Sequence, residues 1–263
     1  MTSEDDRLAH DLAAEAGRRL VTLRARDGEP EDLRKAGDRM SHEFITAELA
    51  RLRPGDCVLS EEGADNPARL TADRVWIVDP LDGTREFGDD GRTDWAVHVA
   101  LWQRAQRERA PGQRGALTAG AVALPAQDEV LSTASPPPAP PSVPPAGRLR
   151  IVVSRTRPAP FLPRLAEILG ADLVPLGSAG AKVAAVLKGE ADAYVHAGGQ
   201  YEWDSAAPVA VAKRCGFHAS RIDGSGLFYN QADLLMPDIL VCPPVLAGPL
   251  LDAIRSARQD GRH

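Results

Sequence analysis

The stretch WIVDPLDGTREF, Trp76 to Phe87, places two aspartates, a glycine and a threonine directly after a short apolar run. The run from Val75 to Val78 is typical of a buried strand, so Asp79 is expected at the carboxyl-terminal edge of a sheet, where α/β proteins often bind ligands. Leu81 can then offer its carbonyl oxygen and Asp82 a second carboxylate. Because Mg²⁺ prefers hard oxygen ligands and keeps several waters, these residues predict a magnesium site that a substrate phosphate completes.

The residues that follow can hold a phosphate group. The amides of Gly83 and Thr84, with a helical turn expected from Arg85, can bind phosphate oxygens as helix N-termini do. By itself the stretch has an equally good structural explanation, because Asp-Pro and Asp-Gly dipeptides often only end a strand.

Two further acidic motifs strengthen the magnesium interpretation. In LSEEGAD the adjacent carboxylates Glu61 and Glu62 again follow an apolar run, and in YEWDSAAP Asp204 stands where a helix of small residues begins. Each has a simple alternative, a solvated loop for Glu61 and a helix N-cap for Asp204. Three acidic ends of strands or helices in one chain are harder to explain as unrelated turns.

The elements that must position these motifs fall into two halves. Residues 135–147, SPPPAPPSVPPAG, lack apolar periodicity, and their prolines favour extended conformations, so this segment is predicted to be an exposed linker. Residues 1–134 are predicted to open with two helices, one behind a Ser3 cap and one behind Asp38, and to continue as a largely antiparallel sheet. Residues 148–263 alternate strand-like and helix-like segments, which indicates an α/β half.

Composition narrows the class of protein. The 263 residues, 43% hydrophobic and 26% charged, suffice for a proper core, and the net charge of -6 argues against a nucleic-acid-binding surface. No apolar run approaches the length of a membrane-spanning helix, and the acidic N-terminal residues do not resemble a secretory signal, so we expect a cytoplasmic protein without a membrane partner.

The cysteines, Cys57, Cys215 and Cys242, lack the spacing of zinc ligands and are interpreted as buried thiols. The arginine-rich run from Arg104 to Arg114 is interpreted as a solvated connection.

Together, LSEEGAD, WIVDPLDGT and YEWDSAAP, in this order and separation, resemble the inositol monophosphatase superfamily of magnesium-dependent, lithium-sensitive phosphomonoesterases. The resemblance spans nearly the whole chain and implies a layered αβαβα sandwich built from the α+β and α/β halves. PLGSAGAK, DAYVHAGGQYEWDSAAP and DGSGLFYNQ are most similar to the CysQ-type 3'-phosphoadenosine 5'-phosphate phosphatases of actinobacteria.

This resemblance implies hydrolysis of 3'-phosphoadenosine 5'-phosphate to AMP and phosphate, which would clear a by-product of sulfate assimilation. Inositol-1-monophosphatase or fructose-1,6-bisphosphatase activity is the alternative within the enzyme class, and a catalytically silent ligand-binding homologue is the alternative outside it. A haloacid-dehalogenase phosphatase is disfavoured, because its D-x-D-G-T motif is one residue shorter than D-P-L-D-G-T. The family analogy also suggests a homodimer.

The resemblance assigns roles to individual residues. Two or three magnesium ions would be bound by Glu61, Asp79, Asp82, Asp204 and the carbonyl oxygen of Leu81, with Asp79 bridging two ions and Glu61 also acting in catalysis. The substrate would be contacted by Gly83, Thr84, Arg85, Gly177, Ser178 and Lys182.

Thr84 would orient the attacking water in a dyad with Asp38. The family usually carries a threonine shortly before this aspartate, whereas this chain has Lys35 and a shortened approach, and a helix N-cap is an alternative role for Asp38. An aromatic ring, Phe228 or Tyr229, can stack on adenine, and core packing explains both rings equally well.

The histidines are interpreted as structural because none has a partner at ligand spacing. This interpretation covers His42, His98 and His196.

Overall fold

The computed structural model describes residues 2–26, 29–107 and 113–260, which form seven α-helices and ten strands. The helices are α1 (Glu4–Arg24), α2 (Pro30–Leu52), α3 (Thr84–Gly88), α4 (Leu162–Leu169), α5 (Ala179–Leu187), α6 (Glu202–Arg214) and α7 (Pro244–Asp260). The strands are β1 (Cys57–Ser60), β2 (Arg74–Asp82), β3 (Ala96–Arg104), β4 (Gly115–Leu124), β5 (Glu129–Ser132), β6 (Arg150–Ser154), β7 (Asp172–Leu176), β8 (Ala193–Tyr201), β9 (His218–Ser220) and β10 (Leu235–Cys242).

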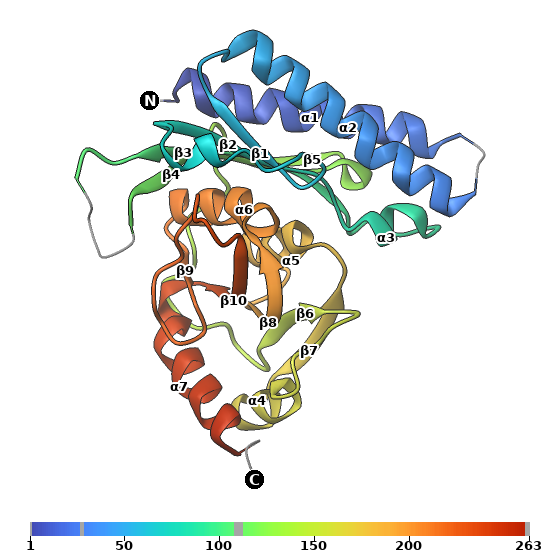
Figure 1. The fold of residues 1–263 in the computed structure, drawn as a ribbon. Helices are drawn as coiled ribbons and strands as arrows, with labels where there is room; N and C mark the ends of the chain where they lie inside the picture. Colours follow the sequence, from blue (N-terminus) through green and yellow to red (C-terminus); the bar gives the residue numbers. More distant parts are fainter. Residues whose placement is uncertain (1, 27–28, 108–112, 261–263) are drawn as a thin grey trace.

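Helices and sheets alternate in five layers (Figure 1). Helices α1 and α2 cover one face of the first sheet, and α5 and α6 lie between the first sheet and the second. Helices α4 and α7 cover the far side of the second sheet. The predicted αβαβα sandwich is therefore confirmed.

The first sheet has the order β1-β2-β3-β4-β5. Strand β1 runs parallel to β2 and the other neighbours are antiparallel, as a largely antiparallel sheet requires. Along β2, Val75 and Ile77 belong to the core between the sheets, whereas Trp76 and Val78 belong to the core beneath α1 and α2. This alternation follows from the two-residue period of a strand and explains why the run is apolar on both faces.

The second sheet has the order β7-β6-β8-β10-β9. Strands β6, β7 and β8 are parallel, and β10 is antiparallel to β8 and to β9. Strand β9 was not predicted, because three residues carry too little periodicity to mark a strand. The helices between the sheets, α5 and α6, are buried on most sides, which is why their sequences are rich in alanine and valine rather than amphipathic.

Helix α2 begins earlier than predicted. It starts at Pro30 and continues through Asp38, so Asp38 lies inside the helix and the expected N-cap role is wrong. Glycine is unfavourable inside a helix, but at position 37 it lets α2 pack closely against its neighbours. A Cβ atom added to Gly37 would lie 2.9 Å from Cε1 of Phe87 and 3.0 Å from Cδ2 of Leu81.

The structure also shows where the proline-rich segment, the arginine-rich run and the cysteines lie. The described residues between β5 and β6 contain no helix or strand, and the arginine-rich run connects β3 to β4, with residues 108–112 lying outside the described part. Cys242 is buried as expected, whereas Cys57 and Cys215 are only half-buried, and all three are free thiols. Within the described ranges, every helix is too short or too polar to cross a bilayer.

Candidate metal and active site

The motif at the end of β2 forms an irregular strand end that buries two carboxylates. The pairing of β2 with β3 is regular up to Asp79 and shifts before Asp82. Asp79 is 1% exposed and Asp82 is 7% exposed. The amide of Leu81 donates to Oδ1 of Asp79 at 3.1 Å, which fixes that carboxylate at the turn. Two acidic groups therefore lie beneath the protein surface, where an unpaired charge is costly.

Glu61 reaches the same place from β1. Because β1 runs parallel to β2, both strands end at the same edge, and the amide of Glu61 donates to the carbonyl oxygen of Val78 at 3.2 Å. Although the Glu61 side chain keeps an exposed surface, desolvation by the surrounding protein, with repulsion from Asp204, raises its pKa to about 7. Burial and the nearby charge of Glu61 also raise the pKa of Asp79 well above its usual range.

Asp204 approaches from the second half of the chain, in the first turn of α6. Its Oδ2 accepts the amide of Tyr201 at 2.5 Å, as in a capping box, so the predicted helix-start role of Asp204 is present in the fold. Burial, with repulsion from Asp82, raises the pKa of Asp204 to about 7. Carboxylates from the ends of β1 and β2 and from the start of α6 thus lie together, and repulsion within the cluster raises the pKa values of Glu61, Asp79 and Asp204.

Thr84 and Asp38 meet beside this cluster. Gly83 adopts a φ of 84°, which is favourable only for glycine, and this conformation turns the chain from β2 into the short helix α3. The hydroxyl of Thr84 can donate to the carbonyl oxygen of Leu81 at 3.0 Å or to Oδ1 of Asp38 at 3.3 Å. Burial, with repulsion from Glu62, raises the pKa of Asp38 to about 7, and the hydrogen bond from Thr84 opposes this shift.

Asp82 is held by the N-terminus of α5. Its Oδ2 accepts hydrogen bonds from Oγ of Ser178 at 2.5 Å and from the amide of Gly180 at 2.7 Å. Ser178 is 1% exposed and its Oγ also caps α5 by accepting the amide of Ala181 at 3.0 Å. Ser178, predicted from sequence to meet substrate, is therefore turned toward a carboxylate of the cluster.

His98 is a member of the cluster that sequence reasoning missed. It lies opposite Asp79 on β3, is fully buried, and places Nε2 3.3 Å from Oδ2 of Asp82. Its Nδ1 is 3.1 Å from the carbonyl oxygen of Trp203, and burial lowers its pKa. Oxygen or nitrogen atoms of Asp79, Asp82 and His98 all lie within 4.8 Å of one another, close enough to hold one metal ion. His98 has no partner at ligand spacing along the sequence, which indicates a structural residue, whereas strand pairing brings it beside two aspartates from a distant segment.

Lys182 carries a buried positive charge near these acids. It is 3% exposed, and its Nζ donates to the carbonyl oxygens of Gly177 and Ser178, the latter at 2.9 Å. Burial lowers its pKa to about 8, while the nearby charge of Asp82 acts in the opposite direction. Lys182 thereby fixes the loop between β7 and α5 as well as supplying charge.

A cavity of about 530 Å³ opens beside the cluster. One side is formed by predicted site residues, namely Asp82, Gly83, Thr84, Arg85, Gly177, Lys182 and Asp204. The other side comes from the second sheet and the loop after β6, and it includes Ser154, Thr156, Arg157, Tyr194, His196 and Gln200. Sequence reasoning assigned no site role to this second side, although Tyr194, His196 and Gln200 lie within DAYVHAGGQYEWDSAAP, which supports only the family resemblance.

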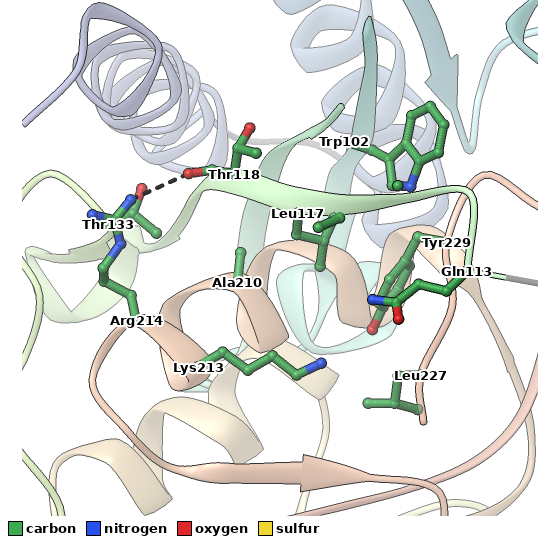
Figure 2. A pocket seen from close by; sticks show the side chains of 12 residues that line it. Trp102, Gln113, Leu117, Thr118, Thr133, Ala210, Lys213, Arg214, Leu227 and Tyr229 are labelled. Atoms are coloured by element: carbon green, nitrogen blue, oxygen red, sulfur yellow. Dashed lines mark hydrogen bonds between the residues drawn. The ribbon is translucent and has the colours of Figure 1, made fainter. Parts of the chain in front are cut away.

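A second cavity, of about 370 Å³, lies between β4 and the carboxyl-terminal half of α6 (Figure 2). Its described lining includes Trp102, Leu117, Lys213 and Tyr229 but no carboxylate. Tyr229 is 4% exposed, and its hydroxyl is 3.2 Å from Oγ of Ser205. Tyr229 therefore packs in the core and lines this second cavity rather than the cavity beside the acidic cluster, which agrees with the core-packing explanation of its ring.

The layered fold and the cluster of buried carboxylates beside a cavity define a metal-dependent enzyme centre of the inositol monophosphatase type. Residues 5–259 match the inositol monophosphatase family, and the chain belongs to this family, as its motifs predicted.

The chain is similar in sequence to two mycobacterial phosphatases and in fold to a bacterial crystal structure. The chain is 51% identical over 250 residues to a 3'-phosphoadenosine 5'-phosphate phosphatase of Mycobacterium bovis, covering 92% of this chain and 91% of the relative. It is 49% identical over 263 residues to the protein of the same name from Mycobacterium leprae, covering 97% and 95%. The crystal structure of CysQ from Bacteroides thetaiotaomicron superposes with a TM-score of 0.75 at 25% identity, covering 90% of this chain and 96% of that one.

Proposed function

We propose that this protein is a magnesium-dependent phosphatase that hydrolyses 3'-phosphoadenosine 5'-phosphate to AMP and inorganic phosphate. The observation that carries the reaction class is the convergence of Asp79, Asp82 and Asp204 beside a cavity that Thr84 also lines. The nucleotide substrate is supported by the two mycobacterial relatives, which carry the name of this activity at 51% and 49% identity.

The acidic cluster suits a hard divalent cation. Burial and mutual repulsion raise the pKa values of Asp79 and Asp204, so the ionised cluster is unfavourable until a cation neutralises it. Nε2 of His98 faces Asp82 and has no satisfactory hydrogen bond within the described chain, another sign that a further group belongs here. Two or three Mg²⁺ ions would be held by Glu61, Asp79, Asp82, Asp204 and the carbonyl oxygen of Leu81. When bound, such ions lower the pKa of water and neutralise charge on the phosphate.

Thr84 and Asp38 would direct the attacking water. When Asp38 is ionised, it can accept the Thr84 proton at 3.3 Å, which leaves a lone pair of Oγ1 free to accept a hydrogen bond from water. When Asp38 is protonated, its own O–H can donate to Oγ1 of Thr84 and occupy that lone pair, while the Thr84 hydroxyl donates to the carbonyl oxygen of Leu81 at 3.0 Å. Since the pKa of Asp38 is about 7, turnover should increase as pH rises through neutrality.

The phosphate would be positioned by backbone amides and fixed charge. Gly83 and Thr84 line the cavity at the start of α3, and Arg85 adds an exposed cation beside them. Lys182 would contribute its charge while it anchors Gly177. We assign Ser178 to orienting Asp82 rather than to contacting substrate, since its hydroxyl is buried against that carboxylate.

The decisive measurement is phosphate release from 3'-phosphoadenosine 5'-phosphate, inositol 1-phosphate and fructose 1,6-bisphosphate, each with and without Mg²⁺. Magnesium-dependent preference for the nucleotide supports the proposal. Preference for either sugar ester would keep the metal centre and refute the substrate. Mg²⁺ binding without phosphate release from any ester would indicate a catalytically silent homologue.

A further inference from the structure

The side of the active-site cavity formed by the second sheet contains a glutamine amide without a partner. Strand β8 presents Tyr194 and His196 to the cavity as alternate residues of one face, and Gln200 joins the lining after an irregularity of the strand between Ala197 and Gln200. Gln200 is 6% exposed, and its Nε2 is buried with no hydrogen-bond partner among the described residues. Buried side-chain amides are usually hydrogen-bonded, so this group has capacity left for a bound molecule.

Its two neighbours on β8 are already engaged within the protein. Nε2 of His196 lies 3.2 Å from the carbonyl oxygen of Gly199, and the ring of Tyr194 lies 5.4 Å from Nζ of Lys182. Gln200 therefore differs from both, since no residue of the described part of the chain partners its Nε2 atom.

The chemistry of an amide indicates what it would bind. It is neutral and offers both N–H donors and a carbonyl acceptor, which complement the edge of a purine or the hydroxyl of a sugar. Arg157 lines the same cavity but is exposed, and its guanidinium makes no hydrogen bond or close ion pair with another described side chain, although its charge acts on Asp204. That permanent cation suits an anionic group near the cavity mouth. A buried neutral amide and an exposed cation thus fit different parts of a nucleotide.

We propose that Gln200 hydrogen-bonds the neutral nucleoside part of the leaving group and so determines specificity without taking part in the phosphate chemistry. This assignment rests on the proposed function, because it takes the substrate to be a nucleotide.

Three phosphate esters separate the contribution of the nucleoside to turnover from that of the second phosphate. 3'-Phosphoadenosine 5'-phosphate carries the nucleoside and a second phosphate, adenosine 3'-monophosphate lacks the second phosphate, and p-nitrophenyl phosphate lacks the nucleoside. The substitution Gln200→Met keeps the side-chain length and removes the hydrogen bonds. We expect it to lower kcat/KM about tenfold for both nucleotides, mainly through KM, and to leave p-nitrophenyl phosphate unaffected.

Two comparison variants test the second phosphate and control for unspecific effects of a glutamine-to-methionine change. Arg157→Met should reduce turnover of the bisphosphate alone, because only that ester carries the second anionic group. Gln103→Met, at a half-buried glutamine on β3 outside this cavity, should change none of the three rates. Gln200→Glu, which has nearly the same shape but loses the N–H donors, provides a second test if Gln200→Met unfolds.

Binding of the product AMP supplies a readout that does not depend on turnover. Calorimetry should show about tenfold weaker AMP binding to the Gln200→Met protein and unchanged binding of inorganic phosphate. Equal losses on all three esters, or unchanged AMP affinity, would overturn the assignment. If the wild-type protein prefers inositol 1-phosphate, the proposed function fails; if it prefers the bisphosphate while both Gln200 variants match it, only the role of Gln200 fails.

Discussion

Replacing Asp38 by asparagine should make the metal-free protein more stable and much less active. The carboxyl of Asp38 is half-buried beside Glu62, and its pKa is raised from 3.8 to about 7. A raised pKa means that the folded protein holds the protonated form while the unfolded chain is already ionised. Stability from this group is therefore fully present below pH 3.8 and is lost as pH rises to about 7.

The size of the effect follows from this window. A change from 3.8 to about 7 corresponds to about 4 kcal/mol between acid and neutral pH, of which about 2–3 kcal/mol falls between pH 5 and pH 8. Asparagine has the same shape and no charge, so it removes this penalty. Since Asp38 keeps some contact with solvent, we expect the Asp38→Asn protein to gain about 1–2 kcal/mol more at pH 8 than at pH 5.

Urea unfolding in the presence of a chelator, at pH 5 and at pH 8, measures this difference directly. Asp11→Asn, at an exposed position on α1, provides the matched control and should show no such dependence on pH. Turnover with Mg²⁺ should fall about 100-fold in Asp38→Asn, because the neutral amide oxygen is a weaker acceptor than the carboxylate that orients Thr84. A stability gain that is equal at both pH values would refute the reasoning about Asp38.

Three further substitutions test the site and its support. Asp79→Asn should reduce turnover at least about 100-fold without lowering the thermal stability of the chelated protein, because it removes a buried like charge; full activity would contradict the metal assignment. Ser178→Ala removes the 2.5 Å hydrogen bond to Asp82 and should weaken Mg²⁺ binding about tenfold in a direct titration, and an unchanged affinity would leave Ser178 as a helix cap only. Gly37→Ala places a Cβ 2.9 Å from Cε1 of Phe87 and should lower the free energy of unfolding by about 1–3 kcal/mol in chemical denaturation, whereas no loss would mean that α2 can shift freely.

The sequence by itself determined the elements and the acidic motifs. Apolar runs before Glu61 and Asp79 identify two strands, because strand periodicity acts between near neighbours, although β2 continues past Asp79 to Asp82. The small-residue pattern after Asp204 likewise predicted a helix there. These local signals marked the candidate carboxylates, and the resemblance of the three motifs to a known family implied the layered fold.

Only the tertiary structure decided which side chains face one another. The pairing of β3 with β2 brings His98 to Asp82, and the docking of α5 turns Ser178 toward that same carboxylate. The need for glycine at position 37, inside α2, comes from the close approach of Phe87, and the unpartnered amide of Gln200 depends on what β8 buries. Burial, pKa and hydrogen-bond partners arise from residues distant along the chain, so no local pattern of residue types could have specified them.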